Sequence, residues 1–390
     1  MDVDRRTLLI SLTSTAATLA LPKHALGALA TECFAAARKD DRGNFSAALF
    51  SLNGDMRSVE LPGRGHDIAL RPDGGHWVAF ARRPGRFGVA VPVGAGQPIW
   101  FATKSDRHFF GHGVFSADGR LLYSTENDYD GARGMIGVRD VTGGYKQIGE
   151  FPAHGMEPHD IALLSDGRTM VIANGGILTH PGSEGELNLS DMQSSLIYVD
   201  VETGDLTEEH CLALELHQLS IRHLAIGAGD VVAFGCQYRG PEEDAPSLIG
   251  FHRRGEQPVI VPAPSGTQEG LRNYIGSVAA DSSGGIVAAS APKGGLVTYW
   301  DISSLRYLGV SDLNDGCGLA PTHHQANFLL TSGEGWLATA DSSGAMECQA
   351  SSSGTITRFW CAKTALLTVS RWFLIPIMTL FIGLMSELIP

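Results

Sequence analysis

A histidine-containing segment recurs along the chain at nearly constant intervals, and it constrains the fold more than any other feature. The first three histidines, His66, His112 and His159, are 46 and 47 residues apart, and the fourth, His223, follows 64 residues later. After each of the first three comes an Asp-Gly pair and then a β-rich stretch. A repeat of about 40–50 residues, built of short strands with a turn at a fixed offset, is typical of a β-propeller.

The rest of the chain supports this fold class. Strands alternate with Gly, Asp and Asn turns, and the middle of the chain has no sustained helical periodicity. We therefore predict an all-β fold, a seven-bladed β-propeller over residues 31–345, made of radially arranged antiparallel sheets whose closure into a ring removes exposed sheet edges. The seven blades are expected to begin near Thr31, Arg64, Gly111, Glu157, His217, Leu271 and Asp315.

One blade is longer than the others. Residues 180–195 of the fourth blade have the composition of a loop and account for most of the 64-residue interval. A long loop in a compact fold often covers a functional site. The alternative, to which we give equal weight, is a surface loop without a function.

The N-terminus has the pattern of an export signal. Arg5 and Arg6 precede a mildly apolar run over residues 10–21, and Ala28-Leu29-Ala30 supplies the small residues of a cleavage site. Paired arginines before a weakly hydrophobic stretch indicate a twin-arginine signal peptide over residues 1–30. We therefore expect a periplasmic protein whose mature chain starts near Thr31.

The C-terminal residues 346–390 differ from the blades. Residues 372–385 form an uncharged run of 14 residues, bracketed by Arg371 and Glu387. This run is shorter than the ~20 residues of a spanning helix. It fits a marginal membrane anchor, a hydrophobic flap or a foreign reading frame fused by a frameshift, and we favour the frameshift. Any membrane contact is expected only through this tail.

The four histidines are the candidate metal ligands. The first strand of each propeller blade lines the channel, so His66, His112, His159 and His223 are expected to face one mouth. Several neutral imidazoles converging on one cavity suit iron, copper or zinc. The alternative is that each histidine only bonds the backbone of a neighbouring blade.

Other polar residues are expected at the same rim as a cofactor- or ligand-binding set. Arginine and lysine there suit an anionic ligand, and carboxylates and amides would complete a cation site. The alternative is that they serve turns and blade-to-blade packing. The candidates are Arg64, Arg83, Glu126, Asn174, Arg222 and Lys293.

Several function classes are disfavoured. The formal net charge is −13 and the chain has no basic stripe, so we expect no nucleic-acid partner. The sequence also lacks the GxSxG, HExxH, Walker A and CxxCH motifs.

Several motifs follow one another in order at residues 65–67, 80–85, 110–116, 122–128, 171–177, 187–189, 219–225 and 293–295. In these motifs the chain resembles a family of exported bacterial propellers of unknown function, DUF1513, and the resemblance covers about residues 1–340. It implies a seven-bladed propeller similar to YVTN-type, WD40-like and quinoprotein amine-dehydrogenase-like domains. Genes of this family often neighbour those of imelysin-like iron-uptake proteins, which implies a periplasmic role in metal acquisition. The family's closing Trp-Asp-Asn-His segment is missing here, which raises the alternative of an incomplete seventh blade.

These observations favour a periplasmic, non-catalytic binding propeller in metal uptake, foremost of iron, whose partner is a metal ion or a periplasmic protein. The alternatives are a lactonase-like hydrolase or an oxidoreductase at the same rim, and a protein-interaction scaffold. Geometry distinguishes them. Converging imidazoles favour metal, a deep pocket with a carboxylate beside Arg83 favours catalysis, and a flat polar rim favours a scaffold.

Overall fold

The structure, a computed structural model, describes residues 30–183, 185–349, 358–359 and 365–370. The expected signal peptide, apart from Ala30, and the uncharged run at 372–385 lie outside the described residues. The chain divides into two compact units, and residues 33–367 form the larger one. The other comprises residues 1–32 and 368–390. None of the helices in the described part of the chain is long and apolar enough to cross a membrane.

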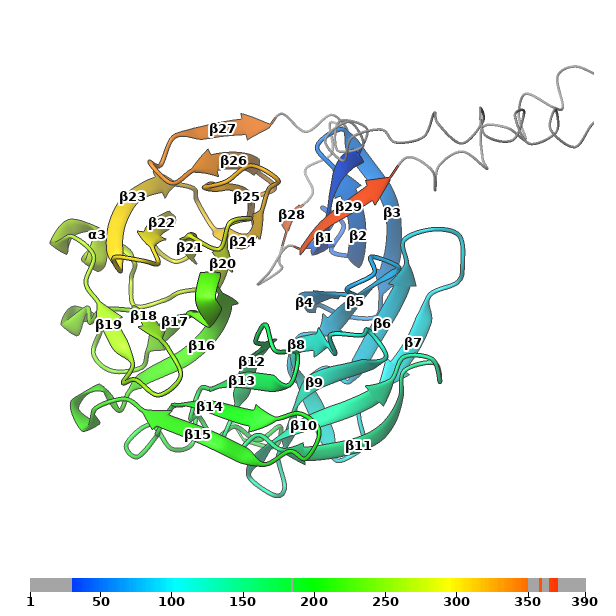
Figure 1. Cartoon of the computed structure of the whole chain (residues 1–390), viewed down its shortest axis with the longest axis horizontal. Coiled ribbons are helices and arrows are strands. Elements are labelled where there is room, and N and C mark those ends of the chain that lie inside the picture. Colours follow the sequence, from blue (N-terminus) through cyan, green and yellow to red (C-terminus); the bar gives the residue numbers. More distant parts are fainter. Residues whose placement is uncertain (1–29, 184, 350–357, 360–364, 371–390) are drawn as a thin grey trace, which may run out of the picture. The chain divides into compact units, whose positions relative to one another are not determined.

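The larger unit is a ring of seven antiparallel sheets, so the predicted seven-bladed β-propeller is confirmed (Figure 1). The first blade contains β1 (Ala30–Lys39), β2 (Phe45–Ser51) and β3 (Gly54–Leu61), and the second β4 (Gly65–Leu70), β5 (His76–Ala81), β6 (Phe87–Pro92) and β7 (Ile99–Ala102). The third contains β8 (Arg107–Phe115), β9 (Leu121–Asp128), β10 (Arg133–Asp140) and β11 (Lys146–Pro152), and the fourth β12 (Pro158–Leu163), β13 (Thr169–Asn174), β14 (Ser195–Asp200) and β15 (Leu206–Cys211).

The remaining three blades follow the same order. The fifth contains β16 (Leu219–Ile226), β17 (Val232–Tyr238), β18 (Ile249–His252) and β19 (Val259–Val261), and the sixth β20 (Ser277–Ala280), β21 (Ile286–Ala291), β22 (Leu296–Asp301) and β23 (Arg306–Asp312). The seventh contains β24 (Gly316–Pro321), β25 (Asn327–Ser332), β26 (Leu337–Asp341) and β27 (Met346–Gln349). The short helices are η1 (Leu214–Leu216), η2 (Ala228–Asp230), η3 (Glu242–Asp244) and α3 (Ser265–Gly270).

The first blade takes strands from both ends of the chain. Its order is β28-β1-β2-β3, where β28 is Arg358–Phe359, and β29 (Ala365–Ser370) also pairs with β1. In the register between β1 and β28, Arg38 lies opposite Phe359 and Lys39 opposite Arg358. The seventh blade has four strands, and its last, β27, lies just past the domain boundary expected at residue 345.

The repeated Asp-Gly pairs make the tight turns between the first and second strands. In Asp118-Gly119 the glycine has φ +69° and its N–H donates to the carbonyl of Ser116, while the aspartate carboxylate accepts from the N–H of Arg120. A positive φ suits glycine because it has no Cβ. The same turn recurs at Asp73-Gly74 and Asp166-Gly167.

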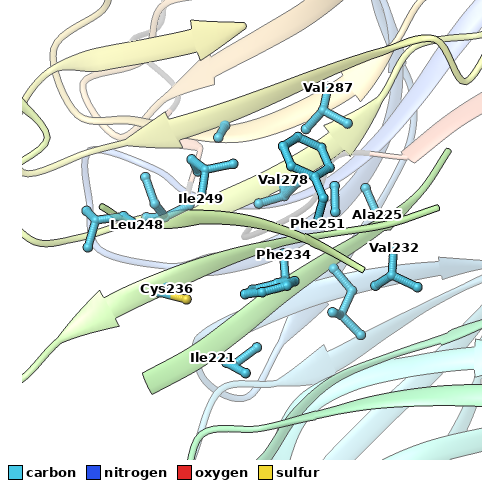
Figure 2. Close-up of a cluster of buried hydrophobic side chains, with 14 of the residues drawn as sticks. Ile221, Ala225, Val232, Phe234, Cys236, Leu248, Ile249, Phe251, Val278 and Val287 are labelled. Atoms are coloured by element: carbon cyan, nitrogen blue, oxygen red, sulfur yellow. The ribbon is translucent and has the colours of Figure 1, made fainter. Parts of the chain in front are cut away.

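Apolar side chains fill the spaces between adjacent sheets. The largest cluster runs across the fourth, fifth and sixth blades, and Phe234, Cys236 and Val278 belong to it (Figure 2). Central strands such as β17 are buried along nearly their whole length, which is why they consist of apolar residues without strict alternation. This packing holds the innermost strands β4, β8, β12, β16, β20 and β24 around the centre of the ring (Figure 1).

Candidate metal centre and ligand cavity

Each of the four candidate histidines lies on the innermost strand of its blade. His66 is on β4, His112 on β8, His159 on β12 and His223 on β16. The register of each of these strands with its neighbour shifts at or next to the histidine. A β-bulge places an extra residue in one strand and redirects its side chains. The four bulges therefore turn the histidines toward the channel.

The four rings converge. The ring centroids of His66 and His112 are 4.7 Å apart, those of His112 and His159 5.0 Å, and those of His159 and His223 4.9 Å. One ligand atom from each of His66, His112 and His159 lies within 4.8 Å of the others. The same is true of His112, His223 and Asp160. The four histidines therefore lie together, and two overlapping triads could hold a metal ion.

His112 is the most deeply enclosed of the four and has two carboxylates beside it. Its Nδ1 lies 3.1 Å from an oxygen of Asp67 and 3.4 Å from an oxygen of Asp160. Burial by itself lowers the pKa of His112, but the carboxylates of Asp160 and Asp67 outweigh it and raise the pKa to about 9. Its Nε2 is buried and has no hydrogen-bond partner among the described residues.

The neighbouring histidines titrate in the opposite direction. Burial, together with the positive charge of nearby groups, holds the pKa of His66 and the pKa of His159 well below the ordinary value. For His159 the nearest such group is Arg222, whose Nη1 donates to His159 Nδ1 at 3.1 Å. Both rings are therefore neutral at neutral pH, the form that binds metals.

A buried glutamate joins two arginines beside the histidines. Oε1 of Glu157 accepts from Arg83 at 2.6 Å and also from Arg222. Glu157 and Arg222 are each 1% exposed. The carboxylate next to Arg83 is thus enclosed by two guanidinium groups and is not among the residues that line the cavity described next.

Two cavities lie on either side of the histidine layer. One, of about 500 Å³, is lined by His66, His159 and His223, by residues that precede the histidines on the inner strands, such as Arg222, and by residues that follow the second strands, such as Lys293. The other, of about 390 Å³, is lined mainly by apolar residues that follow the histidines on the same strands, such as Leu70, Leu163 and Ile226. The first cavity is polar and charged, and we call it the cationic cavity.

The structure brings four of the six predicted ligand-binding residues to the cationic cavity: Arg64, Arg83, Arg222 and Lys293. Arg83 and Lys293 follow the second strands of their blades, as the offset of the repeat predicted. The blade-four loop contributes Glu186 to the lining, so this loop does reach the site.

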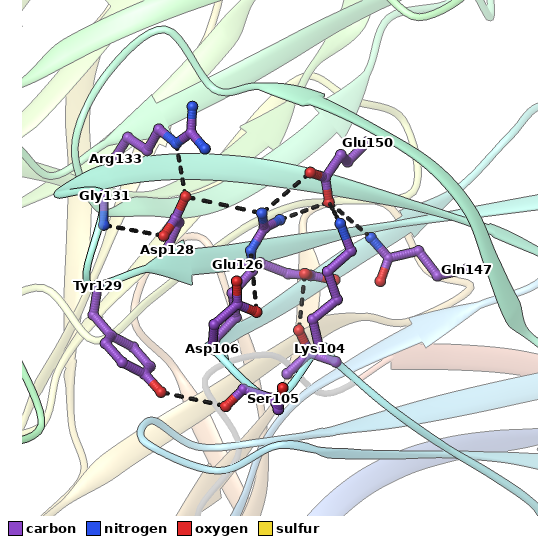
Figure 3. A network of polar contacts seen from close by, with 12 residues as sticks. Lys104, Ser105, Asp106, Glu126, Asp128, Tyr129, Gly131, Arg133, Gln147 and Glu150 are labelled. Carbon is purple, nitrogen blue, oxygen red and sulfur yellow. Dashed lines mark hydrogen bonds and ion pairs between the residues drawn. The ribbon is translucent and has the colours of Figure 1, made fainter.

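The other two predicted residues lie elsewhere. Glu126 is fully buried inside the third blade, where it accepts from Arg139 at 2.7 Å and from Thr103 at 2.9 Å. It stands next to an ion-pair network in which Lys104 meets Glu150 (Figure 3).

Asn174 is also fully buried, and its amide donates to the carbonyl of Ala153 at 2.9 Å. Neither Glu126 nor Asn174 lines the cavity.

Several functional side chains were not among the predicted ones. Asp67 and Asp160 follow His66 and His159 directly, and the repeated His-Asp pair was the available signal. In a regular strand, neighbouring residues point to opposite faces, so the His-Asp pair gave no reason to expect both side chains to be buried at the channel. The bulges interrupt this alternation. Glu157, which pairs with the predicted Arg83 and Arg222, was also missed, and so was the ion pair between Arg239 and Glu186.

A second triad of potential ligands lies away from the channel. Glu208, His210 and His252 offer ligand atoms within 4.8 Å of one another. Their polar atoms are already engaged, because His210 Nε2 lies 2.6 Å from Glu208 and His252 Nε2 lies 2.9 Å from the carbonyl of Glu256. The hydroxyl of Tyr198 meets the other nitrogen of His252 at 2.5 Å. We interpret this group as a satisfied hydrogen-bond network.

The fold and the site define a class: a seven-bladed β-propeller with a cluster of histidines in its channel and a cationic cavity above it. Residues 59–358 match the family described as "Protein of unknown function (DUF1513)", and the chain belongs to this family. A comparison with curated protein sequences gave no match.

Two solved structures show the same fold. The Kuenenia stuttgartiensis hydrazine synthase is similar at a TM-score of 0.52 and 15% identity, over 79% of this chain and 90% of that one. A chain of a mitotic checkpoint complex is similar at a TM-score of 0.58 and 12% identity, over 82% of this chain and 92% of that one. At such low identity the similarity concerns the fold alone.

Proposed function

We propose that this protein is a periplasmic binding propeller that holds a transition metal, foremost iron, on its channel histidines and serves metal uptake. The observation that carries the proposal is the convergence of His66, His112 and His159, one of which, His112, has a buried ring nitrogen with no partner among the described residues. A buried polar atom without a partner is costly unless something binds it.

The chemistry of the donors fits a borderline metal ion. Imidazole nitrogens suit iron, copper and zinc. A ligating histidine usually donates its second ring N–H to a carboxylate, which fixes the tautomer and makes the ring a better donor. His112 has this arrangement, with Asp67 and Asp160 at Nδ1 and a bare Nε2. His159 would exchange its hydrogen bond from Arg222 for the metal.

Export and family context support the compartment and the role. The paired arginines near the N-terminus favour twin-arginine export, and the resemblance described above links the family to iron-uptake genes. A second candidate is a hydrolase or oxidoreductase at the same rim, for which the specific observation is Glu157 beside Arg83, although this carboxylate does not line the cavity. Turnover of a lactone that a Glu157→Gln variant abolishes would favour the enzyme instead.

Calorimetric titration of chelator-treated protein with iron, copper and zinc tests the metal site. We expect at least one metal to bind and to raise the melting temperature, because a ligand that binds only the folded state stabilises it. His66→Ala and His159→Ala should each weaken metal binding by about ten-fold or more. In the double variant the loss of binding free energy should be smaller than the sum of the two single losses, since both histidines act on one ion.

Two other histidines serve as controls. His324 is exposed and outside the cluster, so His324→Asn should bind like the wild type. His210→Asn tests whether any bound metal belongs to the second triad instead. The absence of heat and of a melting shift with all three metals would end the proposal, as would a loss confined to His210→Asn.

A further inference from the structure

The cationic cavity has a charge opposite to that of the chain around it. The whole sequence has a formal net charge of −13, whereas six cationic side chains and only two carboxylates, Glu186 and Asp315, line this cavity. The cationic side chains are Arg64, Arg82, Arg83, Arg222, Arg239 and Lys293. Even with the adjacent Glu157 included, positive groups exceed negative ones by three.

The contacts within the protein leave part of this charge unsatisfied. Arg83 and Arg222 share a single oxygen of Glu157, and Arg239 reaches Glu186 at 3.3 Å. Arg222 is 1% exposed, yet its Nε and Nη2 have no hydrogen-bond partner among the described residues. Guanidinium N–H groups are strong donors, and leaving them buried and unpaired is unfavourable unless a ligand accepts from them.

The titration of the arginines agrees with an excess of positive charge. Burial, and then repulsion from Arg222, lowers the pKa of Arg239. Burial also lowers the pKa of Arg83, and Arg222 and Arg82 act in the same direction against the attraction of Glu157. A bound anion would relieve this repulsion.

We propose that the cationic cavity binds a small organic anion that carries two or more carboxylate groups. A volume of about 500 Å³ admits a small metabolite, and a single inorganic ion would leave most of it unfilled. The planar guanidinium fork matches a carboxylate with two parallel hydrogen bonds. Phe110 and Tyr274 in the lining offer apolar contact for the carbon skeleton, and Lys293 lies over the Tyr274 ring at 4.7 Å.

This proposal goes beyond the metal site and does not depend on it. His66 and His159 also line the cavity, so an anion held by the arginines would lie next to any metal on the histidines. The guanidinium of Arg222, 3.1 Å from His159, would otherwise repel a metal cation. Anion binding is therefore tested in chelator-treated protein without metal, and metal binding without anion, so that either can fail alone.

Calorimetric titration of metal-free protein with citrate, succinate, acetate and inorganic phosphate tests the cavity. We expect saturable one-to-one binding of citrate or succinate, binding of acetate weaker by about ten-fold or more, and affinity that falls as salt rises. Phosphate that binds as tightly as citrate would overturn the carboxylate assignment, and no saturable binding of citrate or succinate would overturn the site.

Two variants connect the binding to the cavity. Arg239→Gln and Lys293→Gln avoid the buried Arg222, whose replacement endangers folding, and each should weaken citrate binding by about ten-fold. Arg120→Gln is the matched control, because it removes the same charge from an exposed arginine that pairs with Asp118 outside the cavity. An equal loss in all three variants would show only a general charge effect and would contradict the proposal.

Discussion

His112 combines two opposed properties in one side chain. It is fully buried, which disfavours its charged form, and its Nδ1 lies beside the carboxylates of Asp67 and Asp160, which favour the charged form more strongly. In metal-free protein the ring is therefore an imidazolium at neutral pH. A metal ion that binds its Nε2 must displace a proton, so metal and proton compete for this one atom.

The charge on His112 predicts how the stability of metal-free protein depends on pH. The pKa of His112 rises from an ordinary 6.5 to about 9 on folding, so its contribution is fully present below pH 6.5 and is lost as pH rises through 9. We expect the free energy of unfolding to fall by on the order of 1–3 kcal/mol over this window. Denaturant unfolding at several pH values measures it.

His112→Gln is the control for that prediction, because it removes the titrating ring and keeps a polar side chain. Its stability should depend less on pH between 6.5 and 9 than that of the wild type. If the free energy of unfolding of this variant falls as steeply with pH as that of the wild type, other groups cause the effect. If the variant does not fold, NMR titration of the His112 ring in the wild type gives the same answer.

The sequence predicted the histidines of the site but not their carboxylate partners. The positions of His66, His112, His159 and His223 follow from the repeat, because equivalent positions in successive blades face the same axis. The positions of Asp67 and Asp160 could be predicted only with knowledge of the bulges. Bulges depend on the pairing between strands and have no fixed sequence pattern.

Glu126 was predicted at the rim because it occupies the position within the repeat at which the second strands of other blades end. In the third blade this strand continues to Asp128, so Glu126 lies within it and faces Arg139 between strands.

At the level of elements, the irregularity in β8 requires a glycine next to its histidine. Gly111 precedes His112 with a φ of +108°, and a Cβ there would lie 2.5 Å from the ring of His66. The close approach of two neighbouring blades thus depends on one missing side chain.

Gly111→Ala should therefore disturb both stability and the metal centre. We expect a loss of about 2–5 kcal/mol, from the left-handed backbone and from the clash with His66, and metal affinity lowered by about ten-fold or more. Chemical denaturation and the metal titration measure the two effects.

Gly144→Ala separates the two causes of that loss. Gly144 also has a positive φ, +72°, but a Cβ there meets nothing within 4 Å. Gly144→Ala should lower the free energy of unfolding by only about 1 kcal/mol and leave metal binding unchanged. Equal effects of the two substitutions would contradict the role assigned to Gly111.

For the whole molecule, export is the property that the N-terminal sequence predicts most directly. Replacing Arg5 and Arg6 together with lysine should retain the protein in the cytoplasm, because the export receptor recognises the guanidinium pair rather than charge alone. Cell fractionation and immunoblotting measure this. Normal periplasmic delivery of the double variant would contradict twin-arginine export, and a variant altered only at Lys23 provides the control.

The fold was the part of the molecule that the sequence predicted best. A repeat of nearly constant length, with an Asp-Gly turn in each of the first three units, leaves few architectures other than a ring of similar sheets. The tail was harder to predict, because β28 is only two residues long and its pairing with β1 joins segments far apart in the sequence. Such long-range pairings have no local sequence period.

The pairing of β1 with β28 also determines when, during translation, the first blade can be completed. Lys39 and Arg358 lie opposite each other although 319 residues separate them, so the first blade remains unfinished until nearly the whole chain has left the ribosome. An incompletely translated copy would leave this edge of β1 open to proteases and to other unpaired strands. The first blade is therefore completed only in chains that have been translated almost to the end, and the twin-arginine route that we propose would carry such folded chains.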